Sequence, residues 1–198
     1  MKHAVILAHP NPTSFNGSVA QAYVLAATAL GHQVVVRDLY ALGFDPRLAS
    51  LELPFSEGFE PGADVRAERS LLADADVYAL VYPLWLNAPP AMMKGYLERV
   101  FGYGFAYGKD GHGSEPLLTG RRLISFSSSG APLHWVEESG AFAAIRTLFD
   151  NHFAAVCGLT NIDHVHFGHI VPGIRPDAVL KILDEVGKAV RKHFGRLQ

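Results

Sequence analysis

Five short hydrophobic runs, each bounded by turn residues, divide the chain. They cover His3–Ala8, Gln33–Val36, Val77–Tyr82, Arg122–Phe126 and His164–Phe167. Several of these runs are continuous and do not alternate with polar residues, which is typical of strands that are covered on both faces. The pattern therefore predicts five parallel strands.

Between these runs, apolar residues recur at helical spacing. The predicted helices cover Asn16–Leu30, Ala63–Leu72, Pro90–Phe101, Glu137–Ala155 and Asp177–Phe194. Strands that alternate with helices predict βαβ units and a doubly wound α/β sheet. Two longer connections break this alternation: residues 40–61 are rich in proline, glycine and phenylalanine, and residues 102–120 carry six glycines. We expect each to act as a lid or an interface segment.

Composition narrows the class of protein. Of the 198 residues, 49% are hydrophobic and 18% are charged, which predicts one globular domain over residues 1–198. No basic run stands out among 17 Lys+Arg and 19 Asp+Glu, so we expect no nucleic-acid partner. Cys157 is the only cysteine and cannot form an intrachain disulfide. No apolar segment is long enough to cross a membrane or resembles a signal sequence, which favours a cytoplasmic protein without membrane insertion.

Candidate chemistry lies in the loops that follow the strands, since open α/β sheets bind ligands at the carboxyl ends of their strands. The first loop, residues 9–16, carries a histidine, hydroxyls and an amide into a helix N-terminus, which suits a phosphate. Simple N-capping by Thr13, Ser14 or Asn16 is the alternative, but it explains only one of them. The loop has neither a G-x-G-x-x-G pattern nor a Walker lysine, which argues against a Rossmann dinucleotide domain and an NTPase.

Two further loops suit a planar ring. After the third strand, prolines stiffen residues 82–90 around Trp85, which would form a flat, partly apolar wall. The alternative is that Trp85 and Leu86 are core filler. After the fourth strand, residues 127–132 are small, so their backbone N–H groups could approach the edge of a ligand closely. No G-x-S-x-G elbow is present, which argues against a serine hydrolase.

Three motifs together resemble those of the flavodoxin-like NAD(P)H:quinone oxidoreductases. They are L-A-H-P-x-x-x-S-F-N after the first strand, Y-P-L-W-x-x-x-P-P-A-x-x-K-G-Y-x-E-R-V-F around the third, and G-F-A-Y soon after. The resemblance implies a flavodoxin-like, three-layer α/β/α fold with strand order 2-1-3-4-5. It also implies hydride transfer from NADH or NADPH through a bound flavin to a quinone or similar electrophile, by ping-pong kinetics.

The resemblance further implies FAD as the cofactor, with FMN as the alternative, and a homodimer. The implied cofactor-binding residues are His9, Thr13, Ser14, Phe15, Asn16 and Ser18 in the first loop, Pro83, Leu84, Trp85 and Leu86 in the second, and Ser127, Ser128, Ser129 and Gly130 in the third. Phe105, Tyr107 and Trp135 are expected in the substrate pocket or at the dimer interface. Phe105 and Tyr107 would reach across to the neighbour, unless they fold back on their own subunit.

The chain departs from the family pattern at one point. Mammalian quinone reductases of this family carry a tyrosine and a histidine beyond the glycine-rich turn, which are proposed to relay charge. Here Trp135 stands near the tyrosine position, and no histidine follows at the expected offset. His134 is left as the one catalytic candidate, and the catalytic residues are otherwise unassigned.

The dimer expectation also has a basis in the residues. The helix Pro90–Phe101 carries more apolar side chains than one sheet face can cover, so the excess should be buried against a partner.

Two rival functions stay open. One is a flavin-bearing accessory or regulatory subunit of a potassium efflux system, as some relatives of the family are. The other is a metal protein, because His164 and His166 should point to the same face of a strand, within a run of three histidines and an aspartate over residues 163–169. No second acidic cluster completes a coordination shell, so no metal ligand is assigned.

Overall fold

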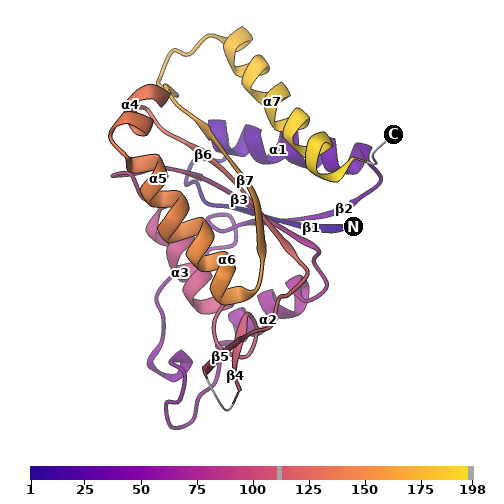
Figure 1. Ribbon diagram of the computed structural model, residues 1–198, viewed down its shortest axis with the longest axis vertical. Coiled ribbons are helices and arrows are strands. Elements are labelled where there is room, and N and C mark those ends of the chain that lie inside the picture. Colours follow the sequence, from indigo (N-terminus) through magenta and orange to yellow (C-terminus); the bar gives the residue numbers. More distant parts are fainter. Residues whose placement is uncertain (111–112, 196–198) are drawn as a thin grey trace.

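Five parallel strands form the central sheet of the computed structural model, which describes residues 1–110 and 113–195 (Figure 1). The strands are β1 (Lys2–Leu7), β2 (Gln33–Asp38), β3 (Val77–Pro83), β6 (Arg122–Ser128) and β7 (Thr160–Phe167). Their spatial order is β2-β1-β3-β6-β7, with every neighbouring pair parallel, which confirms the predicted order 2-1-3-4-5. β3 is buried along its whole length, as its continuous hydrophobic run predicts.

Helices cover both faces of the sheet and make three layers (Figure 1). One face packs against α1 (Phe15–Ala29) and α7 (Pro176–Phe194), which lie side by side. The opposite face packs against α2 (Ala63–Leu72) and α3 (Ala91–Val100), and also against the helical stretch 141–157.

The predicted helix Glu137–Ala155 is wrong as a single element. The short helix α4 (Leu133–Glu138) ends near Gly140, whose φ of +73° is a left-handed conformation that no α-helix can include. A second stretch then runs through α5 (Ala141–Ile145), the π-helical turn η2 (Arg146–Asn151) and α6 (His152–Cys157). The fifth strand also begins at Thr160, four residues before the predicted start.

The premise of excess apolar surface on α3 is also wrong, because this chain itself buries most of that surface. Met93, Tyr96, Leu97, Val100 and Phe101 are all buried within the chain. The connection after β2, which includes the 3₁₀ turn η1 (Ser50–Glu52), lies against this helix.

An ion-pair cluster anchors that connection to α3. Arg99 donates to both carboxylate oxygens of Glu52 at 2.8 Å and to Asp64 at 2.7 Å. Gly95 makes the close approach possible, because a Cβ there would lie 2.1 Å from the carbonyl oxygen of Pro46. The cluster therefore fixes a segment that hydrophobic patterning left without structure.

The glycine-rich connection after α3 contains an unpredicted hairpin. Strands β4 (Tyr107–Asp110) and β5 (Gly113–Pro116) pair antiparallel as a separate two-stranded sheet. Within the described ranges, 1–110 and 113–195, no helix combines the length and hydropathy that a membrane span requires.

Candidate functional site

The loops after β1, β3, β6 and β7 meet at the carboxyl edge of the sheet and enclose a cavity of about 450 Å³. This volume lies within the range of about 300–1,000 Å³ that is usual for small-molecule sites. Backbone hydrogen bonds hold the loops in place: Leu84 N–H donates to the Ser128 carbonyl at 2.6 Å, and Ala8 N–H donates to the Val81 carbonyl at 3.0 Å. The rule that ligands bind at this edge of an open α/β sheet therefore points to a real cavity here.

The first wall is the start of α1. Ser14 is the N-cap, and its hydroxyl accepts the N–H of Gly17 at 3.1 Å. Among the described residues, nothing accepts the N–H groups of Phe15 and Asn16, which leaves two donors at the positive end of a helix. An anion at this end of the cavity would satisfy both.

Side chains of the preceding loop are fixed by their neighbours. Asn11 Oδ1 accepts both the N–H and the hydroxyl of Thr13 at 2.9 Å. The Asn11 N–H donates to His9 Nδ1 at 3.0 Å, which leaves the hydrogen of a neutral imidazole on Nε2. His9 is thus a second kind of donor on the same wall.

The second wall is a tight turn that presents Trp85. Trp85 and Ala88 exchange backbone hydrogen bonds of 2.9 and 3.1 Å, and the two residues between them, Leu86 and Asn87, have φ of +52° and +56°. This is the geometry of a two-residue hairpin turn, in which a leucine is an uncommon choice. Trp85 is 44% exposed, lies 5.9 Å from His9 between ring centroids, and is therefore not core filler.

The third wall joins the loops after β6 and β7. The amide of Asn16 donates to the Ser128 hydroxyl at 3.0 Å, which ties this wall to the first. Ile170 N–H donates to the Ser129 carbonyl at 2.9 Å. Gly168 permits the approach of the two loops, because a Cβ there would lie 2.4 Å from the backbone nitrogen of Leu133.

Most of the predicted binding residues come together on these walls. Those that line the cavity are His9, Thr13, Ser14, Phe15, Asn16, Pro83, Leu84, Trp85, Ser128, Ser129 and Gly130. Three others lie elsewhere. Ser18 bonds back to the Ser14 carbonyl within α1, Leu86 projects fully into solvent at the tip of the turn, and Ser127 is buried against two histidines.

The remaining candidates lie outside this cavity. His134 and Trp135 are exposed on α4. The Phe105 ring packs on Phe101 of its own chain, with 5.8 Å between ring centroids, and Tyr107 lines a different cavity. The fold-back alternative therefore describes how Phe105 packs in this structure.

Sequence reasoning missed one wall segment. Residues 170–174 after β7 line the cavity with Ile170, Val171 and the turn at Pro172 and Gly173. The Pro-Gly pair was a usable signal, because it stands where the topology rule places a fourth loop beside the other three. Asn11, between the two prolines of the first loop, was missed as well.

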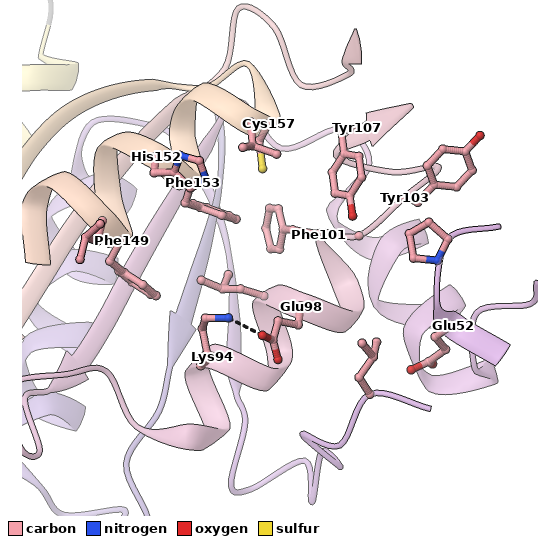
Figure 2. Close-up of a pocket in the computed structure, with 16 residues that line it drawn as sticks. Glu52, Lys94, Glu98, Phe101, Tyr103, Tyr107, Phe149, His152, Phe153 and Cys157 are labelled. Atoms are coloured by element: carbon pink, nitrogen blue, oxygen red, sulfur yellow. Dashed lines mark hydrogen bonds and ion pairs between the residues drawn. The ribbon is translucent and has the colours of Figure 1, made fainter. Parts of the chain in front are cut away.

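A second cavity of about 330 Å³ lies between α3 and α6, and Figure 2 shows its aromatic lining. The rings of Phe101, Tyr107, Phe149 and Phe153 line it, and an ion pair between Lys94 and Glu98 borders it. Cys157 also lines it, and burial raises the pKa of this thiol to about 12, so the thiolate is scarce at neutral pH.

His164 and His166 do share one face of β7, as predicted, but their nitrogens are already engaged. Ser127 Oγ lies within 2.8 Å of a nitrogen on each ring, and the other two nitrogens face Asp150 and Ser129. The described part of the chain contains no group of three or more His, Cys, Asp or Glu residues placed to hold a metal ion. The histidines therefore belong to a hydrogen-bonded chain.

Comparison with known proteins gives consistent matches. A family profile described as the flavodoxin-like fold matches residues 1–194. An uncharacterized NAD(P)H oxidoreductase of Haemophilus influenzae is 33% identical over 171 residues, which cover 86% of this chain and 85% of that protein. A ribosyldihydronicotinamide dehydrogenase [quinone] of Pongo abelii is 31% identical over 73% of this chain and 70% of its own length. The structure of an NAD(P)H:quinone oxidoreductase from Methanothermobacter marburgensis superposes with a TM-score of 0.86 at 26% identity, over 100% of this chain and 99% of that one.

Proposed function

The chain belongs to the flavodoxin-like NAD(P)H oxidoreductase family, and we propose that it passes hydride from NAD(P)H through a bound flavin to a quinone or a similar electrophile. The observation that carries this proposal is the cavity itself. One end offers unpaired N–H donors at a helix N-terminus, and the other offers an exposed tryptophan on a rigid turn. A phosphate-bearing ligand with a planar ring fits both ends.

The walls suggest how the chain would hold such a ligand. The N–H groups of Phe15 and Asn16 would bind phosphate oxygens, helped by the helix dipole. The Trp85 turn would support the ring, and the small side chains of Ser129 and Gly130 would let backbone N–H groups reach the ring edge. The flavin, when bound, supplies the redox chemistry, while the protein supplies binding, orientation and electrostatics.

FAD is the flavin that we propose, because the Thr13–Asn16 run resembles that of the FAD-binding branch. Extraction of the chromophore and mass measurement distinguish FAD from FMN. Thermal denaturation with each flavin tests the whole proposal, since a ligand at 100 times its dissociation constant adds about 2.7 kcal/mol to the free energy of unfolding. If neither flavin raises the melting temperature, the assignment is wrong.

Steady-state kinetics test the reaction. NADH and NADPH are each varied against a soluble quinone, and parallel lines in double-reciprocal plots are expected, because one pocket serves donor and acceptor in turn. A cytoplasmic location, where both donors are available, forms part of this proposal. Intersecting lines would contradict the single-pocket scheme and leave the flavin assignment standing.

A homodimer also forms part of the proposal, and the face around α3 supports it. The aromatic cavity of Figure 2 shares Lys94, Leu148 and Phe149 with the lining of a third, apolar cavity. This third cavity is also lined by Asn87 and Ala88, which belong to the Trp85 turn. A partner subunit on this face would therefore lie beside the proposed flavin site, where Tyr107 of one subunit could approach the other.

Two matched substitutions test this interface. Leu148 is 75% exposed on this face and Leu180 is 68% exposed on α7, across the sheet. We expect L148E to shift the protein towards monomers in sedimentation velocity, and L180E to leave it dimeric. Monomeric wild-type protein at assay concentrations, or equal behaviour of the two variants, would contradict the proposed interface.

A further inference from the structure

Five hydrogen-bonded side chains connect the protein interior to the wall of the loop cavity. The Asp150 carboxylate lies 2.5 Å from His164 Nδ1, and His164 Nε2 lies 2.7 Å from Ser127 Oγ. Ser127 Oγ lies 2.8 Å from His166 Nδ1, and His166 Nε2 lies 3.0 Å from Ser129 Oγ. Asp150 is completely buried, whereas Ser129 lines the cavity. Of these five side chains, only Ser129 would contact a flavin in the cavity.

The buried end departs from regular structure. Asp150 lies in the π-helical turn η2, and such turns occur frequently at functional sites. Its second carboxylate oxygen accepts the hydroxyl of Ser125 at 2.8 Å. A buried carboxylate destabilises the folded state unless it is paired, so Asp150 needs a partner of opposite charge or several hydrogen-bond donors.

The Phe142 ring contacts both histidines and the Arg146 side chain. Phe142 packs against both rings, with centroid separations of 5.0 Å to His164 and 5.6 Å to His166. The guanidinium of Arg146 lies 5.8 Å from the centroid of Phe142. The low local polarity strengthens each hydrogen bond in the chain.

Two neighbouring groups keep a fixed protonation state near neutral pH. Burial, and secondarily the charge of His164, lowers the pKa of His166 to about 4, so His166 stays neutral. Burial, and secondarily the charge of Asp150, raises the pKa of Tyr82 well above its ordinary value, so this phenol keeps its proton. The ring nitrogen that faces the buried carboxylate is His164 Nδ1, so a proton gained by the cluster would be paired there with the charge of Asp150.

Two arrangements of hydrogens satisfy the chain, and they differ by one proton. In the first, His164 Nδ1–H donates to Asp150, Ser127 donates to His164, His166 Nδ1–H donates to Ser127, and Ser129 donates to His166. In the second, His164 is an imidazolium, Ser127 donates to His166, and His166 Nε2–H donates to Ser129. The Ser129 hydroxyl is then free to bond the Ala131 carbonyl 3.0 Å away or a ligand in the cavity.

We propose that this chain is a proton wire that loads one proton onto the Asp150–His164 pair when a ligand against Ser129 gains negative charge, and returns it when that charge leaves. This inference rests on the proposed function for the nature of the ligand. Loading turns Ser129 from a hydrogen-bond acceptor towards the cavity into a donor. It also switches the tautomer of His166 while that ring remains neutral.

The step balances over one turnover. A hydride carries two electrons and one proton, so it leaves one negative charge on a neutral acceptor, and the wire compensates by taking one proton from solvent through the cavity. When the hydride passes to a quinone, the wire returns its proton through Ser129 to a quinone oxygen, which completes the hydroquinone. NAD(P)H, a solvent proton and a quinone are consumed, and NAD(P)⁺ and a hydroquinone are formed.

Two serines on β6 provide a matched test. Ser125 and Ser127 are equally buried, two residues apart, and both bond into the cluster, but only Ser127 lies within the wire. S127A removes the bridging hydroxyl, S125A removes a donor to Asp150, and S127T restores a hydroxyl at the bridging position. A purely structural cluster would be disturbed to a similar degree by S125A and S127A.

The first measurement counts protons. Flavin-loaded protein is reduced by NADH without oxygen in weakly buffered solution that contains a pH indicator. We expect one proton fewer per hydride in S127A than in wild type, S125A or S127T. Equal proton uptake in S125A and S127A, with normal flavin binding and reduction, would overturn the wire and leave the proposed function intact.

The second measurement needs no flavin, so it stands even if the proposed function fails. Side-chain ¹⁵N shifts of the histidines are followed during an acid titration of the cofactor-free protein. In wild type and S125A, His166 is expected to change from the Nδ1–H to the Nε2–H tautomer as His164 becomes charged. In S127A the two events should be uncoupled. A His166 tautomer that does not depend on the charge of His164 in wild type would refute the inference.

Discussion

Gly168 offers a sharp test of how closely the loops of the site must approach one another. It follows β7, where the next two N–H groups, from His169 and Ile170, donate to the carbonyls of Ala131 and Ser129 at 2.8 and 2.9 Å. A Cβ at Gly168 would lie 2.4 Å from the backbone nitrogen of Leu133, a separation that real Cβ atoms do not show. G168A must therefore displace backbone.

The expected size of the effect follows from two opposing contributions. Forcing an extra methyl group into a packed site costs about 1–3 kcal/mol. Restricting the unfolded chain by replacing glycine with alanine gains about 0.4–1 kcal/mol. The free energy of unfolding should therefore fall by roughly 1–2 kcal/mol. For a chain of this size, that loss lowers the melting temperature by about 2–8 °C.

The matched control is Gly187 in α7. A Cβ there would meet only the flexible end of Arg191, at 3.1 Å, and alanine is favoured over glycine inside a helix by about 1 kcal/mol. Urea denaturation of cofactor-free protein should show G168A destabilised and G187A unchanged or stabilised. Flavin affinity should fall only in G168A, because its clash moves the loop that carries Ser129. A G168A variant with wild-type stability and flavin affinity would refute this account of the site.

Three further predictions follow from burial and exposure. W85A should weaken flavin binding at least tenfold, about 1.4 kcal/mol by titration, whereas W135A, at an equally exposed tryptophan outside the cavity, should bind as wild type does. Burial chiefly lowers the pKa values of His3 and His166 to about 4, so between pH 6.5 and 4 the unfolded chain binds more protons than the folded one. As the pH falls through this window, the free energy of unfolding should fall by up to ~3 kcal/mol per histidine. A urea midpoint that does not change with pH would contradict this. Cys157, buried with a raised pKa, should react with iodoacetamide at neutral pH only after denaturation, as followed by mass spectrometry.

The sheet and three of the four loops of the site were predictable, because each depends on local pattern and a topological rule. A strand buried on both faces must be hydrophobic throughout, as β3 is, and parallel strands bring the loops that follow them to one edge. The polar loop residues Ser14, Asn16 and Ser128 could therefore be assigned to one site before any contact between them was known.

The proton wire could not be predicted from the sequence pattern. In the sequence, nothing distinguishes Asp150 from other acidic residues of a predicted helix. Its partner His164 lies 14 residues further along the chain, on β7. Only the packing of η2 against the sheet brings the two side chains together. The histidines attracted attention as possible metal ligands, because sequence spacing shows which side chains share a face but not which hydrogen bonds already occupy them.

The bond between Asn16 and Ser128 joins residues 112 positions apart, and the last wall segment ends at Ile174. A chain emerging from the ribosome cannot form the cavity until nearly all of it has been synthesised and the central strands have paired. Ligand binding therefore requires the sheet and the loops at its edge to be in place, and it stabilises that folded state. In a cell short of this ligand, a larger fraction of the protein would open and be exposed to proteases, so its abundance should follow the ligand supply.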